Sequence, residues 1–595
     1  MKKNLILILC LFINLLCLKS ISAMQENLIQ YQISFPNPEN HYCNVTLKFT
    51  STASSHILGM PVWTPGSYLV REYSKHIDKI WLSGASNSAA MVKINKNQWK
   101  ISCKKGALIE ITYQLYCNEI SVRTNFVDYS QAFICPAATF LYIKGLEKSP
   151  CLVRVVPNKY WKKMACALAI SKFEVKADNY DLLVDAPIQV GNHDEFDFDI
   201  DGVKHTVVMV GKNNADYTKL AVDMQKILRQ TIAVFGELPI NNYLFIVHNT
   251  QNQGGGLEHL NSAVLMMPSQ DYKDYDKYMG FISLVAHEYF HLWNVKRIRP
   301  KELGPFNYDE ENYTNLLWFF EGFTAYYDEL LLYRAGFIDK ENYFKKITST
   351  ISQTEYRPGV QVQNLADASF DAWIKAYRPN ENSFNTQISY YGKGSIVALL
   401  LDITISSNKK DSQNIDVLMK ALWKMYKKQP QKGLIESDII AASESAAGIS
   451  LTTFFNELIY STKSPNYDSF FNLVGLDFTK IADNNKPHIG LTTKKIEGKL
   501  VVSNVYFNSA FYNAGINVND EIIALNNMRV EDLQTAIDTC IIGDKVVLMI
   551  SRAGQILNLE VKLSKNPNDL LKITAQKNLT ANQKTTQTIW LKKGL

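Results

Sequence analysis

Two histidines four positions apart could bind one metal ion. His287 and His291 lie in the sequence His-Glu-Tyr-Phe-His, which has apolar residues on both sides. On a helix, residues four apart share a face, so both imidazoles can reach one ion while Glu288 projects beside them. Zinc bound in this way leaves one position to water, whose pKa falls to about 7, and a nearby carboxylate can accept its proton. The pattern predicts a zinc hydrolase site with Glu288 as the general base.

Zinc in such a site needs a third protein ligand, and Glu321 is the best candidate in the chain. It is the lone acid in the apolar stretch 318–327, on a helix expected over residues 312–333. A buried carboxylate is costly unless it is paired or bound to a metal. We therefore predict that Glu321 completes the ligand set.

A glycine-rich loop is a candidate substrate-binding element. Gly255 and Gly256 precede Glu258 and His259, and an apolar strand is expected to follow. Glycines allow a backbone to approach a ligand closely, and the edge of an extended strand can pair with a peptide. Taken by itself, the loop could equally be a flexible turn with an exposed acid.

Tyr391 opens a later helical segment. Its phenol could donate a hydrogen bond to the oxyanion that forms when water attacks a carbonyl. The spacing alone is equally consistent with a tyrosine that only packs.

The first 23 residues have the features of a secretory signal peptide. Two lysines are followed by an apolar stretch over residues 5–18 and by small residues that end at Ala23. The stretch is shorter than the ~20 apolar residues that a membrane-spanning helix needs. We expect cleavage after Ala23, export to the periplasm or the outside of the cell, and no membrane partner afterwards.

Composition narrows the class of protein. The chain has 595 residues, 46% of them hydrophobic, and a formal net charge of +6. Cleavage after Ala23 would remove three lysines and leave +3, a balance too weak to indicate a nucleic-acid partner. None of the nine cysteines has C-x-x-C spacing, so a cysteine metal site is not expected, although an exported protein can pair some of them.

Periodicity predicts a multidomain α+β protein. Residues 24–205 contain alternating apolar and polar segments typical of an antiparallel β domain, and the turn-rich stretch 61–71 inside it is interpreted as structural. Residues 206–480 begin as mixed α/β and continue mostly as helix. Residues 481–565 return to short strands and turns, and residues 566–595 are left as a C-terminal tail.

Two family resemblances follow from particular motifs. Residues 481–565 resemble a PDZ domain, chiefly through the Ser-Ala, Ala-Gly-Ile and Asn-Asp-Glu-Ile-Ile-Ala-Leu-Asn segments, and such domains capture peptide C-termini. The whole chain after residue 23 resembles the glycyl aminopeptidase family of gluzincin zinc metallopeptidases. That resemblance rests on four segments: 63–68 with Arg71, 255–259, 287–294, and 321–324 with Tyr326 and Tyr327.

The resemblance implies a thermolysin-like catalytic domain with one Zn²⁺ per chain on His287, His291 and Glu321. Glu288 would be the base and then the acid, Tyr391 the oxyanion donor, and Glu258 the anchor of the substrate amine, within a substrate-binding loop formed by residues 255–259. The chain has His259 where the related aminopeptidase N family has asparagine, and 29 residues separate His291 from Glu321, which is longer than that family's usual spacing.

The expected function is a zinc aminopeptidase that removes glycine or alanine from the N-terminus of peptides. A zinc endopeptidase that recruits substrates through its PDZ domain is the first alternative, and an inactive peptide-binding scaffold is the second. The partners expected are peptide substrates and, at the PDZ domain, peptide C-termini.

Overall fold

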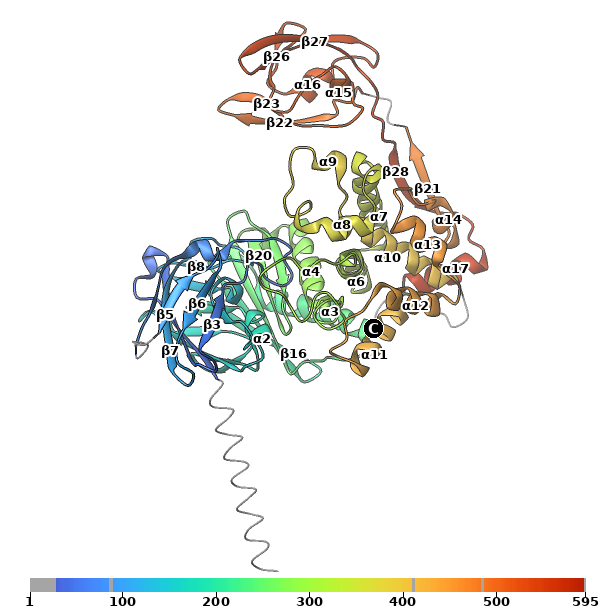
Figure 1. Cartoon of the computed structure of the whole chain (residues 1–595). Helices are drawn as coiled ribbons and strands as arrows, with labels where there is room; N and C mark the ends of the chain where they lie inside the picture. The colour runs from blue at the N-terminus through green and yellow to red at the C-terminus, as the bar shows by residue number, and fades with distance from the viewer. Residues whose placement is uncertain (1–27, 85–88, 409–412, 483–485, 593–595) are drawn as a thin grey trace, which may run out of the picture. The chain divides into compact units, whose positions relative to one another are not determined.

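A computed structural model describes residues 28–84, 89–408, 413–482 and 486–592 (Figure 1). The contacts of the chain define two compact units. The first holds the residues up to Arg229 together with Glu237–Arg297 and Glu302–Asn312; the second holds Gln230–Gly236, Ile298–Lys301 and the chain from Tyr313 onward. The expected signal peptide lies outside the described residues. The predicted multidomain α+β class is confirmed.

The N-terminal part of the first unit is a β domain. Its strands alternate buried and exposed side chains, as in β2 (Tyr42–Thr50) and β7 (Leu108–Tyr116), so one face of the sheet packs into a core. Most strands pair antiparallel, whereas β1 (Ile29–Ser34) pairs in parallel with β11 (Cys151–Val156). The seven-stranded sheet has the order β13-β14-β11-β1-β2-β7-β4, where β13 is Ala169–Ser171, β14 is Glu174–Ala177 and β4 is Ile77–Leu82.

Two smaller sheets complete the β domain. The first has the order β10-β3-β6-β5, and the second has the order β12-β15-β9-β8. Their bounds are β10 (Tyr142–Ile143), β3 (Ser55–Gly59), β6 (Gln98–Ser102), β5 (Ala90–Lys93), β12 (Lys163–Ala165), β15 (Ile188–Gly191), β9 (Gln131–Ile134) and β8 (Phe126–Val127). The short helix α2 (Tyr180–Val184) precedes β15.

A five-stranded mixed sheet forms the rest of the first unit, in the order β16-β17-β18-β20-β19. Its bounds are β16 (Asp194–Ile200), β17 (Val203–Val210), β18 (Asn242–Thr250), β20 (Ser262–Pro268) and β19 (Gly255–Glu258). The neighbouring strands β17, β18 and β20 are parallel and largely buried, while β19 lies antiparallel at the edge. The β domain was expected to run to residue 205, but β16 and the first three residues of β17, which come before that boundary, belong to this mixed sheet.

Two long helices are associated with this sheet, one as a connection between strands and one packed against its edge. Helix α3 (Tyr217–Phe235) joins β17 to β18, and α4 (Tyr275–Phe290) packs against β19 and β20. The Asp274 side chain caps α4 by accepting from the Lys277 backbone N–H. Because the sheet edge and the helix are in contact, β19 and the His-Glu-Tyr-Phe-His segment are brought together.

The second unit is mainly helical before residue 474. Its helices are α5 (Leu317–Phe320), α6 (Gly322–Arg334), α7 (Lys340–Glu355), α8 (Leu365–Phe370), α9 (Ser383–Thr386), α10 (Tyr390–Ser407), α11 (Asp416–Lys428), α12 (Glu436–Ala447), α13 (Thr452–Leu458) and α14 (Tyr467–Leu473). Helix α10 is apolar almost all round and is buried in the centre of this layer. The single helix predicted over 312–333 is instead two helices that meet at Glu321.

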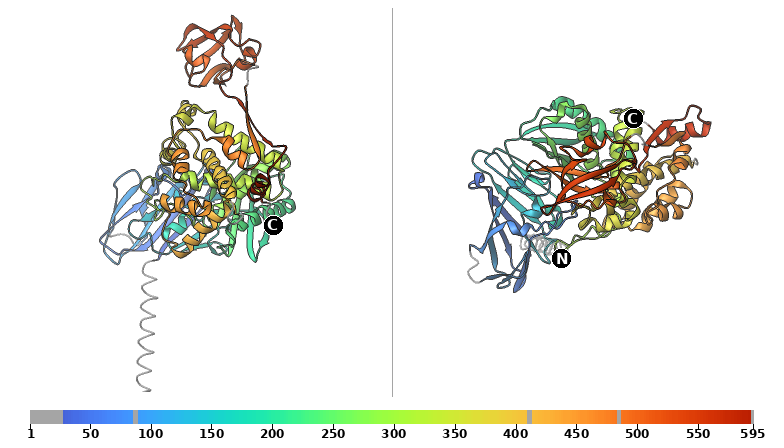
Figure 2. Two further views of the ribbon diagram at one scale, coloured as in Figure 1. Left: turned by 90° about the vertical axis from the view of Figure 1, so that its right-hand side faces the viewer. Right: turned by 90° about the horizontal axis from the view of Figure 1, so that it is seen from above.

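The PDZ module follows a two-stranded ribbon. Strand β21 (Leu476–Ile481) pairs antiparallel with β28 (Leu570–Ala575), so the chain leaves for the module and returns at the same place (Figure 2). The module's sheet has the order β22-β23-β24-β26-β27, with β25 beside β24. Its elements are β22 (Leu491–Ile496), β23 (Lys499–Val505), α15 (Ala510–Asn513), β24 (Glu521–Leu525), β25 (Met528–Arg529), α16 (Leu533–Ile537), β26 (Lys545–Arg552) and β27 (Gln555–Lys562).

The described residues of the expected C-terminal tail, 566–592, are structured. Besides β28 they form α17 (Ala581–Trp590), which packs against α10 and α14. Trp590 is fully buried, and its indole N–H donates to the Tyr326 hydroxyl on α6 at 3.0 Å. The chain end therefore belongs to the core of the helical layer.

Candidate active site

Helix α4 presents the predicted metal-binding histidines. His287 lies in its last turn and His291 is the residue that caps its C-terminus, with the two ring centroids 4.8 Å apart. His291 is 1% exposed and Glu288 is 5% exposed. The two imidazoles thus lie side by side on one face, as the i, i+4 spacing predicts.

The opposite face of α4 is fixed to the mixed sheet through Tyr289. Its hydroxyl lies 2.8 Å from Nε2 of His205 on β17, and Nδ1 of His205 lies 2.9 Å from the Val203 carbonyl. Burial lowers the pKa of His205 to about 4, so the ring is neutral, with Nδ1–H donating to Val203 and Nε2 accepting from Tyr289. This contact sets the rotation of α4 and therefore where His287 and His291 point.

The donor chemistry of His291 fits a zinc ion. Its Nδ1 lies 2.7 Å from the Asn294 carbonyl oxygen, so this nitrogen carries the proton and Nε2 keeps its lone pair. Histidines that bind metals characteristically donate their second ring N–H to such an acceptor. The ligand atoms of Glu258, Glu288 and His291 all lie within 4.8 Å of one another, so three buried donor groups converge beside the helix.

Gly256 on β19 lies directly against Glu288. A Cβ atom on Gly256 would overlap the Glu288 carboxylate, and Gly256 has an ordinary backbone conformation, so the close approach explains the glycine. The carbonyl oxygen of Gly256 accepts from Nη2 of Arg123, in the β domain, at 3.3 Å. The edge strand β19 thus packs directly on the side chain of the expected general base.

Glu258 is a buried carboxylate for which the described residues provide no counter-charge. It is 4% exposed and ends β19. Among the residues that the structure describes, no side chain or backbone N–H donates to its carboxylate and no cation lies within ion-pair distance. Burying an ionised carboxylate without a partner costs several kcal/mol. A cation from outside the protein would offset this cost.

His259, the residue after Glu258, contacts an acid that no pattern in the sequence predicts. Its Nδ1 lies 3.0 Å from Oδ1 of Asp185, which also accepts from Lys296 Nζ at 2.8 Å, and Oδ2 of Asp185 accepts from the Leu260 N–H at 2.8 Å. Burial opposes ionisation of Asp185, but Lys296 and His259 together hold its pKa below the usual value.

Arg297 stabilises the loop that follows β19. Its Nη1 donates to the carbonyl oxygens of Leu260 and Leu292, at 2.9 and 2.7 Å. These contacts tie the loop after β19 to the segment after α4. Because Asp185 is 74 residues before His259, no local pattern in the sequence could have identified the contact.

The second unit contains Glu321 and Tyr391. Glu321 is 2% exposed at the junction of α5 and α6, and Tyr391 lies in the first turn of α10, stacked on Tyr390 at 4.7 Å. Helices α6 and α10 cross where the Cα atoms of Gly322 and Gly394 meet, since a Cβ on either would collide with the other. Each of the two predicted site residues is therefore within three positions of this crossing.

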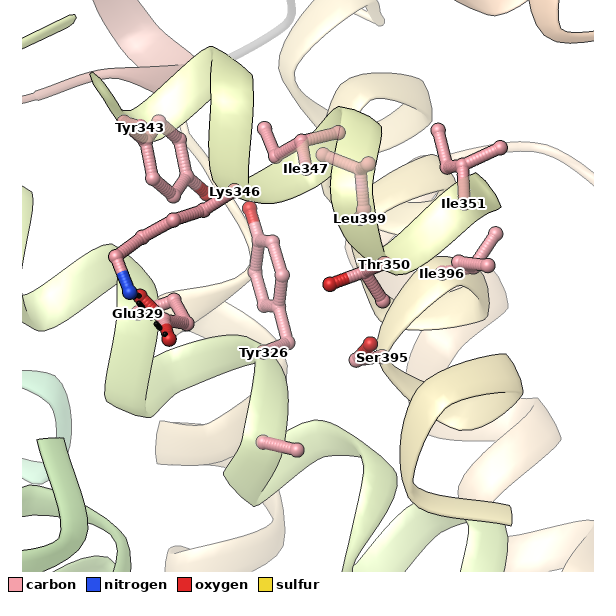
Figure 3. Close-up of a pocket in the computed structure, with 11 residues that line it drawn as sticks. Tyr326, Glu329, Tyr343, Lys346, Ile347, Thr350, Ile351, Ser395, Ile396 and Leu399 are labelled. Atoms are coloured by element: carbon pink, nitrogen blue, oxygen red, sulfur yellow. Dashed lines mark hydrogen bonds and ion pairs between the residues drawn. The ribbon is translucent and has the colours of Figure 1, made fainter. Parts of the chain in front are cut away.

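A cavity of about 340 Å³, including its part open to solvent, lies between α6, α7 and α10 (Figure 3). An ion pair between Lys346 and Glu329, 2.9 Å long, lies on one side of it. Ala325 and Ser395, which line it, are four residues after Glu321 and Tyr391, respectively. The cavity therefore lies in the helical layer, about one helical turn further along the chain from these two residues.

Comparison with protein families agrees with this arrangement of residues. Residues 280–397 match the M61 glycyl aminopeptidase family, residues 30–192 match the M61 peptidase N-terminal domain, and residues 487–563 match the PDZ domain. With the histidine pair and the glutamates on and beside α4, these matches define the chain as a metallopeptidase.

Solved structures extend the comparison to the whole chain. A crystal structure described as an aminopeptidase N family protein from Idiomarina loihiensis is 30% identical, covers 95% of this chain and 100% of its own length, and has a TM-score of 0.88. The chain belongs to the M61 glycyl aminopeptidase family of peptidases. An M1 zinc metallopeptidase from Deinococcus radiodurans is 11% identical over 74% of this chain and 94% of its own, with a TM-score of 0.46. No curated protein matches the sequence.

Proposed function

We propose that this protein is a zinc aminopeptidase that removes a small first residue, glycine or alanine, from peptides. The observation that carries the proposal is the carboxylate of Glu258. It is buried and lacks a partner among the described residues, and it lies beside Glu288 and His291. An α-ammonium group would neutralise it, and a peptide held by that group would place its first peptide bond at a fixed distance from the anchor.

We assign the zinc ion to His287, His291 and Glu321. Two neutral imidazoles and one carboxylate are a ligand set that catalytic zinc commonly has. Support comes from the position of the two histidines on α4 and from the burial of Glu321 in an apolar stretch. Bound zinc would polarise the scissile carbonyl and make water acidic enough to lose a proton near neutral pH.

The protein's own side chains then perform the proton transfers. Glu288 accepts a proton from the attacking water and returns it to the leaving amine, and Gly256 keeps its carboxylate in place. Tyr391 donates to the developing oxyanion, a role in which loss of one donor costs about 3–4 kcal/mol of barrier. Glu258 fixes the amine, with His259 as its neighbour in the loop.

The proposal also covers the cellular location of the protein and the ligand of its PDZ module. Export is proposed from the features of residues 1–23. Fractionation of cells that express the full chain tests it, and a cytoplasmic location would contradict it.

The PDZ module would bind peptide C-termini at β22, which is an edge strand of the module's described sheet and can therefore pair with a peptide on one side. Equal binding of peptides with free and amidated C-termini would contradict that role.

Metal analysis of two variants tests the zinc assignment. Glu321→Ala should lose zinc and peptidase activity together, because a ligand has been removed. Glu288→Ala should keep zinc and lose only turnover, because the base is not a ligand. Zinc content is measured by atomic absorption on protein dialysed under identical conditions. Equal zinc loss in both variants, or full zinc in Glu321→Ala, would contradict the assignment.

A further inference from the structure

A tight turn in the N-terminal β domain lies at the amine-binding carboxylate. The turn runs from Thr64 to Ser67, whose backbone N–H donates to the Thr64 carbonyl at 3.1 Å. Pro65 and Gly66 occupy its two central positions, and Gly66 has φ +85°, the combination that a type II turn requires. Composition alone predicts only a structural role for this stretch.

The backbone of Gly66 packs on the carboxylate of Glu258. A Cβ atom built on Gly66 would lie 2.6 and 2.8 Å from the two carboxylate oxygens and 2.7 Å from Cδ1 of Leu257. Contacts under 3.0 Å cannot be kept, so any side chain here would displace Glu258. The turn therefore covers one side of a carboxylate that otherwise lacks a partner among the described residues.

The turn is held rigidly in this position. Arg71 Nη2 donates to the Ser67 hydroxyl at 2.9 Å, and the Arg71 N–H donates to the Val62 carbonyl at 2.8 Å. The Trp63 indole N–H donates to the Asn307 carbonyl at 2.8 Å. Thr64 and Ser67 are buried. A wall with so many fixed contacts cannot yield to make room for a larger ligand.

We propose that this turn is the end wall of the amine pocket and that Gly66 is a specificity-determining residue. The inference rests on the proposed aminopeptidase function. Because Gly66 has no side chain, the Glu258 carboxylate keeps its position against the turn, and a primary ammonium reaches it from the side that the turn leaves uncovered. A substituent on the amine, or a chain that continues beyond it, meets the backbone of the turn. The β domain thus restricts cleavage to peptides whose first residue carries an unsubstituted amine.

Three substrates given to the full-length zinc enzyme separate charge from size. They are a glycyl, an N-methylglycyl and an N-acetylglycyl peptide with the same following sequence. N-methylglycine keeps the positive charge and the position of the scissile bond but adds one methyl group at the amine. We expect kcat/KM to fall at least tenfold for both modified substrates. Equal cleavage of the glycyl and N-methylglycyl peptides would contradict the proposed end wall. Equal cleavage of the glycyl and N-acetylglycyl peptides would contradict the proposed function itself.

Gly66→Ala with Gly145→Ala as its control tests the residue directly. Gly145 lies in the same domain with φ +87°, and a Cβ there meets nothing within 4 Å, so both variants carry the same backbone strain. We expect full zinc in both variants and a lower melting temperature in both, with the larger loss in Gly66→Ala because of its added contacts. The kcat/KM for the glycyl peptide should fall at least tenfold only in Gly66→Ala. Equal activity of the two variants would contradict the proposal. If Gly66→Ala does not fold, the substrate series on the unaltered enzyme decides.

Discussion

Gly256 allows Glu288 to lie against strand β19, and this contact leads to a prediction at the scale of single residues. In Gly256→Ala the added methyl group would overlap the Glu288 carboxylate and push it from its position. Because the backbone conformation of Gly256 suits alanine, the fold should be kept. We expect kcat to fall by at least tenfold with zinc content unchanged, since a general base contributes about 10²–10⁴-fold.

Gly254→Ala is the matched control for this prediction. Gly254 is two positions earlier, directly before β19, and also has an ordinary φ. The nearest atom to a Cβ there is the Met266 carbonyl oxygen at 3.8 Å. Its kcat should stay within twofold of the unaltered enzyme. Comparable losses of kcat in the two variants would mean that the loop, and not the contact with Glu288, is responsible.

The sequence predicted the residues whose spacing is local and missed those that meet through the fold. His287, Glu288 and His291 follow from helical periodicity within five positions. The contact of Gly66 with Glu258 joins residues 192 positions apart, and only the packing of a β-domain turn on the end of β19 brings them together. A Pro-Gly turn has the same sequence whether it faces solvent or a site, so composition could not distinguish the two cases.

At the scale of elements, a buried hydrogen-bond network joins α6, α10 and the C-terminal helix α17. Tyr326 donates to Asp402 at 2.7 Å and accepts from the Trp590 indole at 3.0 Å. The Ile415 N–H also donates to Asp402, at 2.9 Å. Helix α6 begins beside Glu321, so the chain's last helix supports the helix that follows a predicted zinc ligand. Periodicity did not predict this role for residues 566–595.

This network predicts how stability depends on pH. Burial raises the pKa of Asp402 to about 7, against 3.8 for an exposed aspartate. Between these values the folded state holds a proton that the unfolded state has lost, so stability falls as pH rises from about 4 to 7. A shift of about 3 units corresponds to roughly 4 kcal/mol over that window.

Asp402→Asn should remove this dependence. Its melting temperature should change less with pH than that of the unaltered protein, so the variant gains relative stability as pH rises from 4 to 7. Scanning calorimetry at several pH values measures the difference. Melting curves that shift in parallel for both proteins would show that Asp402 is ionised in the fold.

At the scale of the whole molecule, the PDZ module is an insertion. Ile481 and Leu570 are paired residues of the β21–β28 ribbon, so the module begins and ends at one place. Within the second unit, the Asn385 side chain links the helical layer to the module by donating to the Val505 carbonyl at 2.8 Å and accepting from the Phe507 N–H at 2.9 Å. The sequence resemblance predicted the module, whereas the ribbon and the return of the chain into α17 depend on long-range pairing.

The central claim is that Glu258 holds a free N-terminal amine and so makes the enzyme an aminopeptidase. It is tested most directly by kcat/KM of the unaltered enzyme and Glu258→Gln on a glycyl peptide and its N-acetylated counterpart, with zinc content as a control. The unaltered enzyme should prefer the free amine at least tenfold, about 1.4 kcal/mol, and the variant should lose both this preference and the matching activity. Equal cleavage of both peptides by the unaltered enzyme, or internal cleavage of a long peptide before its first residue is released, would contradict the account and favour an endopeptidase.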